Sequence, residues 1–392
     1  MRILILNADY PRFLAWFYGR QPDLQHATYA AQMTARNDSL FGVADFYSRN
    51  FRALGHTAAE IHVNNPWLQS AWAREHGLGV ALAEPSGGGG QTIPGWLQRA
   101  VAPFKPMLRP LARKVGLSPK LDQAAETILL AQIEAFRPDL VLNQDLFHVD
   151  ARLAERIKQI CAPILVGQVG IEPPRGENWS IYDLMLSQLP RIVDHFRALG
   201  IAADLTHLAF EPSVLDMLPP APAKDTDVSF VGSVSVDHRQ RIALLEAAAE
   251  RFDLKLWGAR PEGLPASSRL HRCYQDEVWG IDMYQTLRRS RITLNSHIDL
   301  AGKEAGNMRL FEATGVATFL LTDFKQNLHT LFEPEQEVSV WRSIPDALSK
   351  IEHYLRDAGS RERIARMGQA STHTRHTYRK RAGEILDLIA KK

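Results

Sequence analysis

Short apolar runs that alternate with helical segments constrain the fold of this chain more than any other feature. The first series of strand-like runs covers residues 2–7, 57–63, 139–143, 163–168, 182–187 and 203–209. The second series covers residues 228–231, 254–257, 292–295, 317–321 and 337–340. Strands that alternate with helices along a chain form parallel sheets with helices packed on them. The pattern therefore predicts two open α/β domains of similar size that face each other across a cleft.

A proline-rich stretch separates the two series. Residues 219–225 read PPAPAKD, and such runs form semi-rigid spacers between domains. The chain has 392 residues, whereas a single core stops growing at roughly 250–300 residues. We therefore expect an N-terminal domain at 1–215, a C-terminal domain at 216–372 and a basic helix at 373–392 that packs at the domain junction.

Charge and cysteine content exclude several classes of protein. The formal net charge of +2 gives no global reason to expect a nucleic-acid partner. Cys161 and Cys273 lie far apart, which predicts neither a disulfide framework nor a zinc knuckle. The first residues do not form a signal peptide, and no apolar run is long enough to span a bilayer. These features predict a cytoplasmic protein without metal or cofactor.

Two segments of the N-terminal half allow broader interpretations. Residues 10–29 are expected to form a long loop, followed by a helical stretch up to residue 54. Residues 96–117 form a basic amphipathic segment, which suggests either peripheral contact with the inner membrane face or a helical hairpin packed on its own domain. The three prolines of this segment favour the hairpin, because they would kink a continuous surface helix.

The segment at 295–323 is the richest in candidate site residues. It reads NSHIDLAGKEAGNMRLFEATGVATFLLTD, which predicts a strand, a glycine-containing loop, a short helix and a further strand. Lys303 and Arg309 flank the helix start, where unpaired backbone N–H groups and the helix dipole favour phosphate. Glu304 and Glu312 can each accept two hydroxyl hydrogen bonds, which suits ribose or sugar diols. The alternative is that Glu312 is an exposed helix residue paired with Arg309.

A second group of candidates follows the strand that begins the C-terminal domain. Ligands of open α/β sheets bind beyond the carboxyl ends of the strands. Gly232 and Ser233 follow the run SFV and would allow a phosphate to approach the backbone closely. Arg239 and Arg241 on the next helix are candidate charge partners, although a solvated helix face explains them equally well.

Candidates in the N-terminal domain also follow strands. Asp145 could serve as a general base or contact an acceptor, with His148 three residues further on; a helix-capping role explains Asp145 equally well. Gln168 ends the fourth run, and a glutamine cannot act as a general base. Asp9 and Tyr10 follow the first strand, where we expect the acceptor to be selected.

The donor-like segment resembles a known signature. Its two glutamates, Glu304 and Glu312, stand where retaining GT-B glycosyltransferases of the glycosyltransferase-4 type carry two glutamates separated by seven residues. The phrases GNMRLFEATGVATFLLTD, SFVGS and RMGQASTHTRHTYRKRAGEIL are similar to those of the CgeB/YkvP-like glycosyltransferase family. YDLMLSQLPRIVDHFRALGI and DLTHLAFEP extend the likeness into the first domain. The resemblance covers the chain from about residue 139 onward and implies a GT-B fold with a glycosyltransferase-4-like C-terminal domain.

This resemblance also implies roles for individual residues. Glu312 would hold the nucleotide ribose, and the donor phosphates would lie against Asn307, Met308 and Arg309. The base would be bound near Trp257, Gly258 and Tyr274. The remaining expected donor contacts are Asn295, Lys303 and Gly306. Glu304, Arg309 and Asp145 are the expected catalytic residues, with Arg309 or Lys303 stabilising the leaving diphosphate.

One departure leaves the stereochemical outcome open. Enzymes of the glycosyltransferase-4 type usually carry a histidine after the fourth strand, where this chain has Gln168. Transfer with inversion would make Asp145 the first candidate for the base, and transfer with retention would depend on the donor's own phosphate.

The implied activity is transfer of a hexose-type sugar from a UDP-, GDP- or TDP-sugar to an unidentified glycan, lipid-linked or protein acceptor. No cluster of carboxylates and histidines has the spacing of a metal site, so we expect metal independence. A sugar-nucleotide epimerase, a phosphorylase and an inactive nucleotide-sugar-binding protein are the alternatives on the same fold. The residues after the first strand, Asn7-Ala8-Asp9, lack the glycines of a dinucleotide-binding motif and argue against an oxidoreductase.

Overall fold

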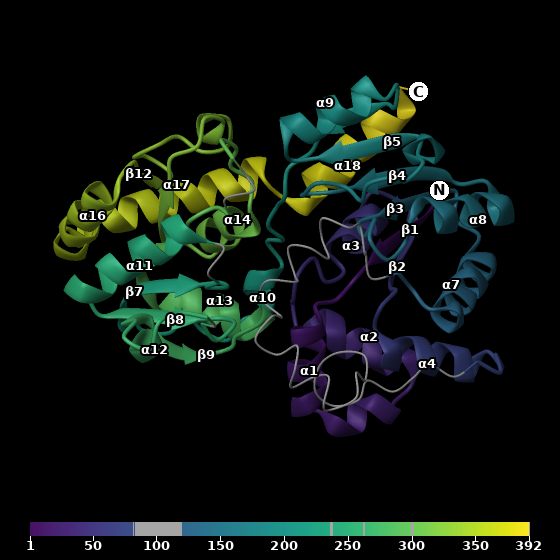
Figure 1. The fold of residues 1–392 in the computed structure, drawn as a ribbon, viewed down its shortest axis with the longest axis horizontal. Helices are drawn as coiled ribbons and strands as arrows, with labels where there is room; N and C mark the ends of the chain where they lie inside the picture. Colours follow the sequence, from purple (N-terminus) through teal and green to yellow (C-terminus); the bar gives the residue numbers. More distant parts are fainter. Residues whose placement is uncertain (81, 83–119, 236–237, 262, 299–301, 392) are drawn as a thin grey trace. The chain divides into compact units, whose positions relative to one another are not determined.

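The computed structural model describes residues 1–80, 82, 120–235, 238–261, 263–298 and 302–391 (Figure 1). The chain divides into two compact units. Unit 1 comprises Met1–Arg36 and Phe51–Leu205, and unit 2 comprises Asn37–Asn50 and Thr206–Lys392. The main division thus falls ten residues before the expected boundary at 215–216, and unit 2 also includes a short piece of the N-terminal half. The basic segment 96–117 lies outside the described residues.

Unit 1 is built on a six-stranded sheet. Its elements are β1 (Arg2–Asn7), α1 (Pro11–Arg20), η1 (Pro22–His26), α2 (Tyr29–Asp38), β2 (Thr57–His62), α4 (Pro66–Glu75), α7 (Gln123–Phe136), β3 (Leu140–Asn143), α8 (Ala151–Cys161), β4 (Ile164–Gln168), η3 (Trp179–Ile181), β5 (Leu184–Ser187), α9 (Pro190–Ala198) and β6 (Ala203–Leu205). Helix α3 (Phe46–Ala53) is divided, with Phe46–Asn50 in unit 2 and the rest in unit 1. The strand order is β2-β1-β3-β4-β5-β6, and each neighbouring pair is parallel.

Continuous apolar strands explain why this sheet is buried. Ile3, Leu4, Ile5 and Leu6 of β1 are at most 1% exposed, as expected where helices cover both faces of a parallel sheet. The connecting helices begin at residues that suit helix starts. For example, the Asp150 carboxylate accepts a hydrogen bond of 2.9 Å from the backbone N–H of Leu153 at the start of α8.

Unit 2 contains the second six-stranded sheet. Its elements are α10 (Val214–Met217), β7 (Thr226–Val231), α11 (Arg239–Arg251), β8 (Leu254–Trp257), α12 (Leu270–Cys273), β9 (Tyr274–Asp276), α13 (Gly280–Arg289), β10 (Ser290–Leu294), α14 (Met308–Gly315), β11 (Phe319–Asp323), α15 (Leu328–Leu331), β12 (Ser339–Trp341), α16 (Ile344–Arg356), α17 (Ala358–Arg375) and α18 (Tyr378–Ala390). The strand order is β12-β11-β10-β7-β8-β9, and each neighbouring pair is parallel (Figure 1).

Strand order locates the switch point of each sheet. In unit 1 the chain changes direction across the sheet between β1 and β3, and in unit 2 it does so between β7 and β10. Open α/β sheets bind ligands beyond the carboxyl ends of the strands at such a point. The loops after these four strands are therefore where the fold favours a site.

The segment Asn37–Asn50 joins unit 2 through specific contacts. The Ser39 carbonyl accepts a hydrogen bond of 3.0 Å from the backbone N–H of Ile281. A Cβ on Gly280, whose φ is +52°, would lie 1.8 Å from that same carbonyl oxygen, so only glycine fits there. Asn50 also donates a hydrogen bond of 2.5 Å to the Glu211 carboxylate. These contacts explain why the piece belongs with a domain more than 150 positions away.

Several expected elements differ in the structure. Residues 10–29 were expected to be a loop but contain α1 and η1, where Pro11 and Pro22 occupy the helix starts that proline favours. The helix expected up to residue 54 is interrupted between α2 and α3, where Leu40 and Ala44 have positive φ. Tyr274 begins β9 rather than ending a strand. In the described part of the chain, no helix is long and apolar enough to cross a membrane.

Candidate functional site

An amide pair fixes the ends of two segments at the switch point of unit 2. Asn295 follows β10, and Asn307 directly precedes α14. The Asn307 side chain donates to Asn295 Oδ1 at 2.8 Å, and the Asn295 side chain donates to Asn307 Oδ1 at 3.2 Å. Asn295 also donates to the Thr322 hydroxyl at 3.0 Å and is only 2% exposed. Asn295, which sequence placed among the donor contacts, thus positions the start of α14.

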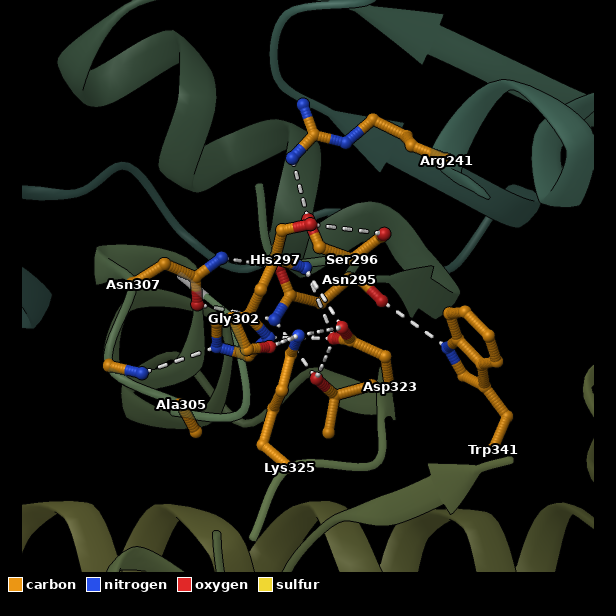
Figure 2. A network of polar contacts seen from close by, with 12 residues as sticks. Arg241, Asn295, Ser296, His297, Gly302, Ala305, Asn307, Asp323, Lys325 and Trp341 are labelled. Carbon is orange, nitrogen blue, oxygen red and sulfur yellow. Dashed lines mark hydrogen bonds and ion pairs between the residues drawn. The ribbon is translucent and has the colours of Figure 1, made fainter. Parts of the chain in front are cut away.

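A histidine and an aspartate continue this network, as Figure 2 shows. His297 Nδ1 lies 2.7 Å from Asp323 Oδ1, and the Gly306 backbone N–H donates to His297 Nε2 at 3.2 Å. Because Nε2 accepts this bond, Nδ1 carries the proton and donates it to the aspartate. Burial alone would raise the pKa of Asp323, but its hydrogen bond to His297 and the Lys325 charge lower it. His297 therefore connects the ends of β10 and β11 to the loop before α14.

The loop from Gly302 to Gly306 is held by residues that follow β11. Lys325 Nζ donates to the Gly302 carbonyl at 2.6 Å, and the Gln326 backbone N–H donates to the Lys303 carbonyl at 2.8 Å. Asn327 makes two hydrogen bonds with the backbone of Ala305, at 2.6 and 3.0 Å. These hydrogen bonds specify the backbone conformation of the loop along most of its length (Figure 2). The Lys303 side chain is exposed and that of Glu304 half-buried.

Among the described residues, the N-cap side chain does not bond to the start of α14. Asn307 occupies the N-cap position in an extended conformation but makes no side-chain cap hydrogen bond, because its amide pairs with Asn295 instead. The first N–H groups of a helix need a partner from outside the helix. Met308 and Arg309, both half-buried, provide the first of these N–H groups.

Arg309 and Glu312 form a buried ion pair one turn into α14. Arg309 Nη1 lies 3.0 Å from Glu312 Oε2, and their side chains are 15% and 8% exposed. Burial raises the pKa of Glu312, and the Arg309 charge opposes that rise. Arg309 Nε has no hydrogen-bond partner among the described residues. The pairing proposed as an alternative therefore exists, but Glu312 is buried instead of lying on an exposed helix face.

Tight backbone packing shapes the loops after β7 and β8. The Gly232 N–H donates to the Trp257 carbonyl at 2.9 Å. Gly258 has a φ of +124°, and a Cβ there would lie 2.5 Å from the Gly232 carbonyl oxygen. Only glycine can occupy this position without displacing the neighbouring loop. Ser233 is exposed and Tyr274 half-buried.

Of Arg239 and Arg241, which follow β7, Arg241 is the one whose side chain lies at the carboxyl ends of the strands. Its guanidinium donates to the Ser233 carbonyl at 2.8 Å and to the Ser296 carbonyl at 2.6 Å, which connects the loops after β7 and β10. It is 6% exposed, so it is not part of a solvated helix face. Arg239 is exposed.

In unit 1 the structure brings together Asp145 and His148. Asp145 Oδ2 lies 2.6 Å from His148 Nδ1, and Asp145 Oδ1 accepts bonds of 3.3 Å from the backbone N–H groups of Phe147 and His148. The carboxylate is 9% exposed and the imidazole 20%. A neutral His148 that donates from Nδ1 leaves Nε2 as a proton acceptor. The geometry thus makes Asp145 the orienting group and His148 the candidate base.

The other expected acceptor residues have different surroundings. Gln168 Oε1 accepts a hydrogen bond of 2.6 Å from Gln144, which connects the loops after β3 and β4. Asp9 is 2% exposed and accepts a bond of 2.6 Å from Arg36. Burial alone would raise the pKa of Asp9, but the charges of Arg36 and His62 hold it well below its usual value. This geometry favours a structural role for Asp9. Tyr10 is 64% exposed.

Sequence reasoning assigned no role to His297 or Asp323. Both residues follow predicted strands, where ligands of parallel sheets bind. Their position after a strand was therefore the one feature of the sequence that could have marked them as site residues. Their pairing depends on the adjacency of β10 and β11, which only the strand order reveals. Over the described ranges, no group of three or more histidines, cysteines, aspartates or glutamates has the arrangement of a metal site.

Comparison with known families places the candidate donor site in a recognised domain. Residues 239–387, which include α14 and the His297 network, match the family model described as "Glycosyl transferase-like". A comparison with curated proteins found no significant match. The coarser part of the resemblance found in the sequence is thereby supported, and membership of the CgeB/YkvP-like family stays a prediction.

Solved structures that resemble the whole chain share its fold. A glycosyltransferase from Rickettsia africae is 10% identical, with a TM-score of 0.58 over 99% of this chain and 97% of its own. HepE from Anabaena, in complex with UDP-glucose, is 11% identical, with a TM-score of 0.57 over 100% of both chains. Sucrose-phosphate synthase from Thermosynechococcus elongatus is 10% identical, with a TM-score of 0.55 over 100% and 98%. With its two parallel six-stranded sheets, this chain has the GT-B fold, and the fold-class prediction is confirmed.

Proposed function

We propose that the protein is a glycosyltransferase that takes a hexose-type sugar from a UDP-sugar bound by unit 2. The observation that carries this proposal is the start of α14, where the first backbone N–H groups and the buried pair of Arg309 and Glu312 lie at the switch point of a GT-B domain. HepE, a structural neighbour, was solved with UDP-glucose, which supports uridine as the base.

The diphosphate is assigned to the first turn of α14. Backbone N–H groups and the helix dipole favour a phosphate there. Arg309 adds a guanidinium whose Nε is unpaired within the described structure. As the sugar–phosphate bond breaks, negative charge develops on the diphosphate, and a fixed cation stabilises it without reorganisation. The exposed ammonium of Lys303 would supply a second positive charge, in place of a metal ion.

The ribose is assigned to Glu312. A carboxylate can accept hydrogen bonds from both hydroxyls of a ribose. Burial raises the pKa of Glu312 and the Arg309 charge opposes that rise. In its ionised form a carboxylate is an acceptor only. The same ion pair therefore serves two neighbouring parts of the nucleotide.

Rigidity of the preceding loop supports this assignment. His297, Lys325 and Asn327 each form a hydrogen bond with a different residue of the loop backbone. A binding loop that is already ordered loses little conformational entropy when the ligand binds. Glu304, in the same loop, is proposed to contact the transferred sugar.

In unit 1, His148 is proposed to accept the proton of the acceptor hydroxyl. Asp145 would hold its tautomer and stabilise the imidazolium that forms, as in other histidine–carboxylate pairs. This changes the role expected for Asp145 from the base to the group that orients the base. Such a base favours direct displacement with inversion of configuration.

A thermal-shift screen tests the proposed donor. The purified protein would be heated with UDP, GDP, TDP, ADP, CMP and UDP-glucose, alongside Arg309→Ala and Glu312→Ala. A ligand at about a hundred times its dissociation constant adds ~2.7 kcal/mol of apparent stability. We expect UDP and UDP-glucose to stabilise the wild type and both substitutions to reduce the shift. A shift that persists in both variants would place the nucleotide elsewhere, and no shift with any nucleotide would refute the proposal.

A further inference from the structure

A cavity lies at the opposite end of the unit 2 sheet from the candidate donor site. It has a volume of about 200 Å³ and is lined by Lys224, Arg291, Ala317, Phe319, Arg361, Glu362, Ala365 and Arg366. Lys224 precedes β7, Arg291 lies at the start of β10, and Phe319 begins β11. The donor site lies beyond the carboxyl ends of these same strands, so the cavity is separate from it.

The cavity carries an excess of positive charge. Four of its lining residues are cations and one, Glu362, is an anion. Arg291 is paired with Asp227 at 2.5 Å, and Arg366 lies 3.8 Å from Glu362. Within the described ranges, Lys224 and Arg361 form no ion pair with a carboxylate, although the charge of Glu362 acts on both.

Among the lining cations, Arg361 is buried and Lys224 is half-buried. Lys224 Nζ donates to the Ser290 carbonyl at 3.1 Å, and Arg361 Nη1 donates to the Tyr354 carbonyl at 2.5 Å. Burial lowers the pKa of Lys224, and the nearby Arg361 charge lowers it further. Burial also lowers the pKa of Arg361. The protein thus holds a buried and a half-buried cation near each other, an arrangement that an additional anion would stabilise.

Size and lining limit what the anion is. Pockets for drug-sized ligands have volumes of about 300–1,000 Å³, so this cavity is too small for a nucleotide. Guanidinium groups match the oxygens of phosphate in geometry as well as in charge. We propose that this cavity binds a small soluble phosphate, such as inorganic phosphate or pyrophosphate, through Lys224 and Arg361, with Arg366 at its rim. This inference does not depend on the proposed donor site.

Calorimetric titration with inorganic phosphate at constant ionic strength tests the inference. Lys224→Met replaces a half-buried cation by a neutral side chain of similar length and should weaken phosphate binding about tenfold. Arg366→Gln acts at the exposed rim, where it leaves folding intact, and should weaken binding by roughly two- to fivefold. Glu362→Gln removes the only lining carboxylate, so it should tighten binding by a similar factor.

Arg309→Gln, titrated in parallel, separates this cavity from the donor site. We expect it to retain the phosphate binding that Lys224→Met weakens, because Arg309 lies at the other end of the sheet, and to lose only any phosphate held at the start of α14. Wild type that binds phosphate no better than chloride overturns the inference. A second result would also overturn it: phosphate binding is abolished in Arg309→Gln but unchanged in Arg366→Gln and Glu362→Gln. The phosphate would then occupy the start of α14.

Discussion

His297 Nδ1 lies 2.7 Å from Asp323 Oδ1, across the ends of two neighbouring parallel strands. The other nitrogen of the same ring accepts a hydrogen bond from the Gly306 backbone, 3.2 Å away. One buried imidazole therefore connects the sheet to the loop that precedes α14. Since His297 is 4% exposed, we interpret it as a positioning residue that holds the loop in the shape the donor needs.

Replacing His297 by alanine should weaken UDP binding about tenfold. The loop would lose its bond to Gly306, and the Asp323 carboxylate would lose its principal partner. Isothermal titration of UDP against the folded variant measures the effect. Asp323→Asn should have a smaller effect, because the amide oxygen can still accept the proton of Nδ1.

His353→Ala is the matched control for this experiment, because it removes an exposed histidine from α16 of the same unit. Its affinity for UDP should equal that of the wild type. If His297→Ala also bound UDP normally while remaining folded, the loop would not need the histidine.

Gly258→Ala should lower the free energy of unfolding of unit 2 by about 1–3 kcal/mol or more. The substitution combines a φ of +124° with a Cβ only 2.5 Å from the Gly232 carbonyl oxygen. Gly302→Ala is the control, because Gly302 has a φ of +60° and no neighbouring atom within 4 Å of an added Cβ. Urea denaturation would show a larger loss for Gly258→Ala. Equal losses would mean that the loops after β7 and β8 are not closely packed.

His148→Gln should slow hydrolysis of UDP-glucose by about a hundredfold or more, because water is then the acceptor and has lost its base. Donor affinity should not change, since His148 belongs to unit 1. Asp145→Asn should cause a smaller loss of rate, through poorer orientation of the ring. Normal turnover by His148→Gln would show that this histidine is not part of the mechanism.

Stability should fall as the pH drops below about 6.5, in part because of His376. Burial lowers the pKa of His376 to about 4 in the folded protein, from 6.5, and nearby Arg381 contributes to the shift. In the unfolded chain the ring gains its proton below pH 6.5, whereas the buried ring stays neutral down to about pH 4. Protonation therefore favours the unfolded state increasingly as the pH falls from 6.5 towards 4, and the histidine makes no difference above that range. The expected loss by pH 5 is about 2 kcal/mol.

Denaturant titrations at pH 7.5 and 5.0 would measure this loss. His376→Gln should show a shallower dependence on pH, because glutamine does not titrate in this range. Its amide can still donate to the Leu331 carbonyl that His376 contacts at 2.7 Å, so that contact is kept. An identical pH dependence in the variant would show that other groups are responsible.

Strand positions were predictable because parallel strands are continuous apolar runs, as Ile3 to Leu6 illustrate. Helix α1 was missed although Phe13, Leu14, Phe17 and Tyr18 recur at helical spacing, because the aromatic and polar composition of residues 10–29 was interpreted as a loop. The pair of Arg309 and Glu312 was predictable from local spacing along one helix, although its burial was not. By contrast, the bond from His297 to Asp323 joins residues 26 positions apart, and sequence alone does not show that their strands are neighbours.

The central claim is that Glu312 binds the ribose of a uridine diphosphate donor. Comparing the dissociation constants of UDP and 2′-deoxy-UDP tests it most directly. The wild type should prefer UDP by about tenfold, since a hydrogen bond to a charged group contributes about 1.5–3 kcal/mol. Glu312→Ala should bind the two nucleotides almost equally. A preference for UDP that persists unchanged in Glu312→Ala would contradict the claim, as would a wild-type protein that binds neither nucleotide.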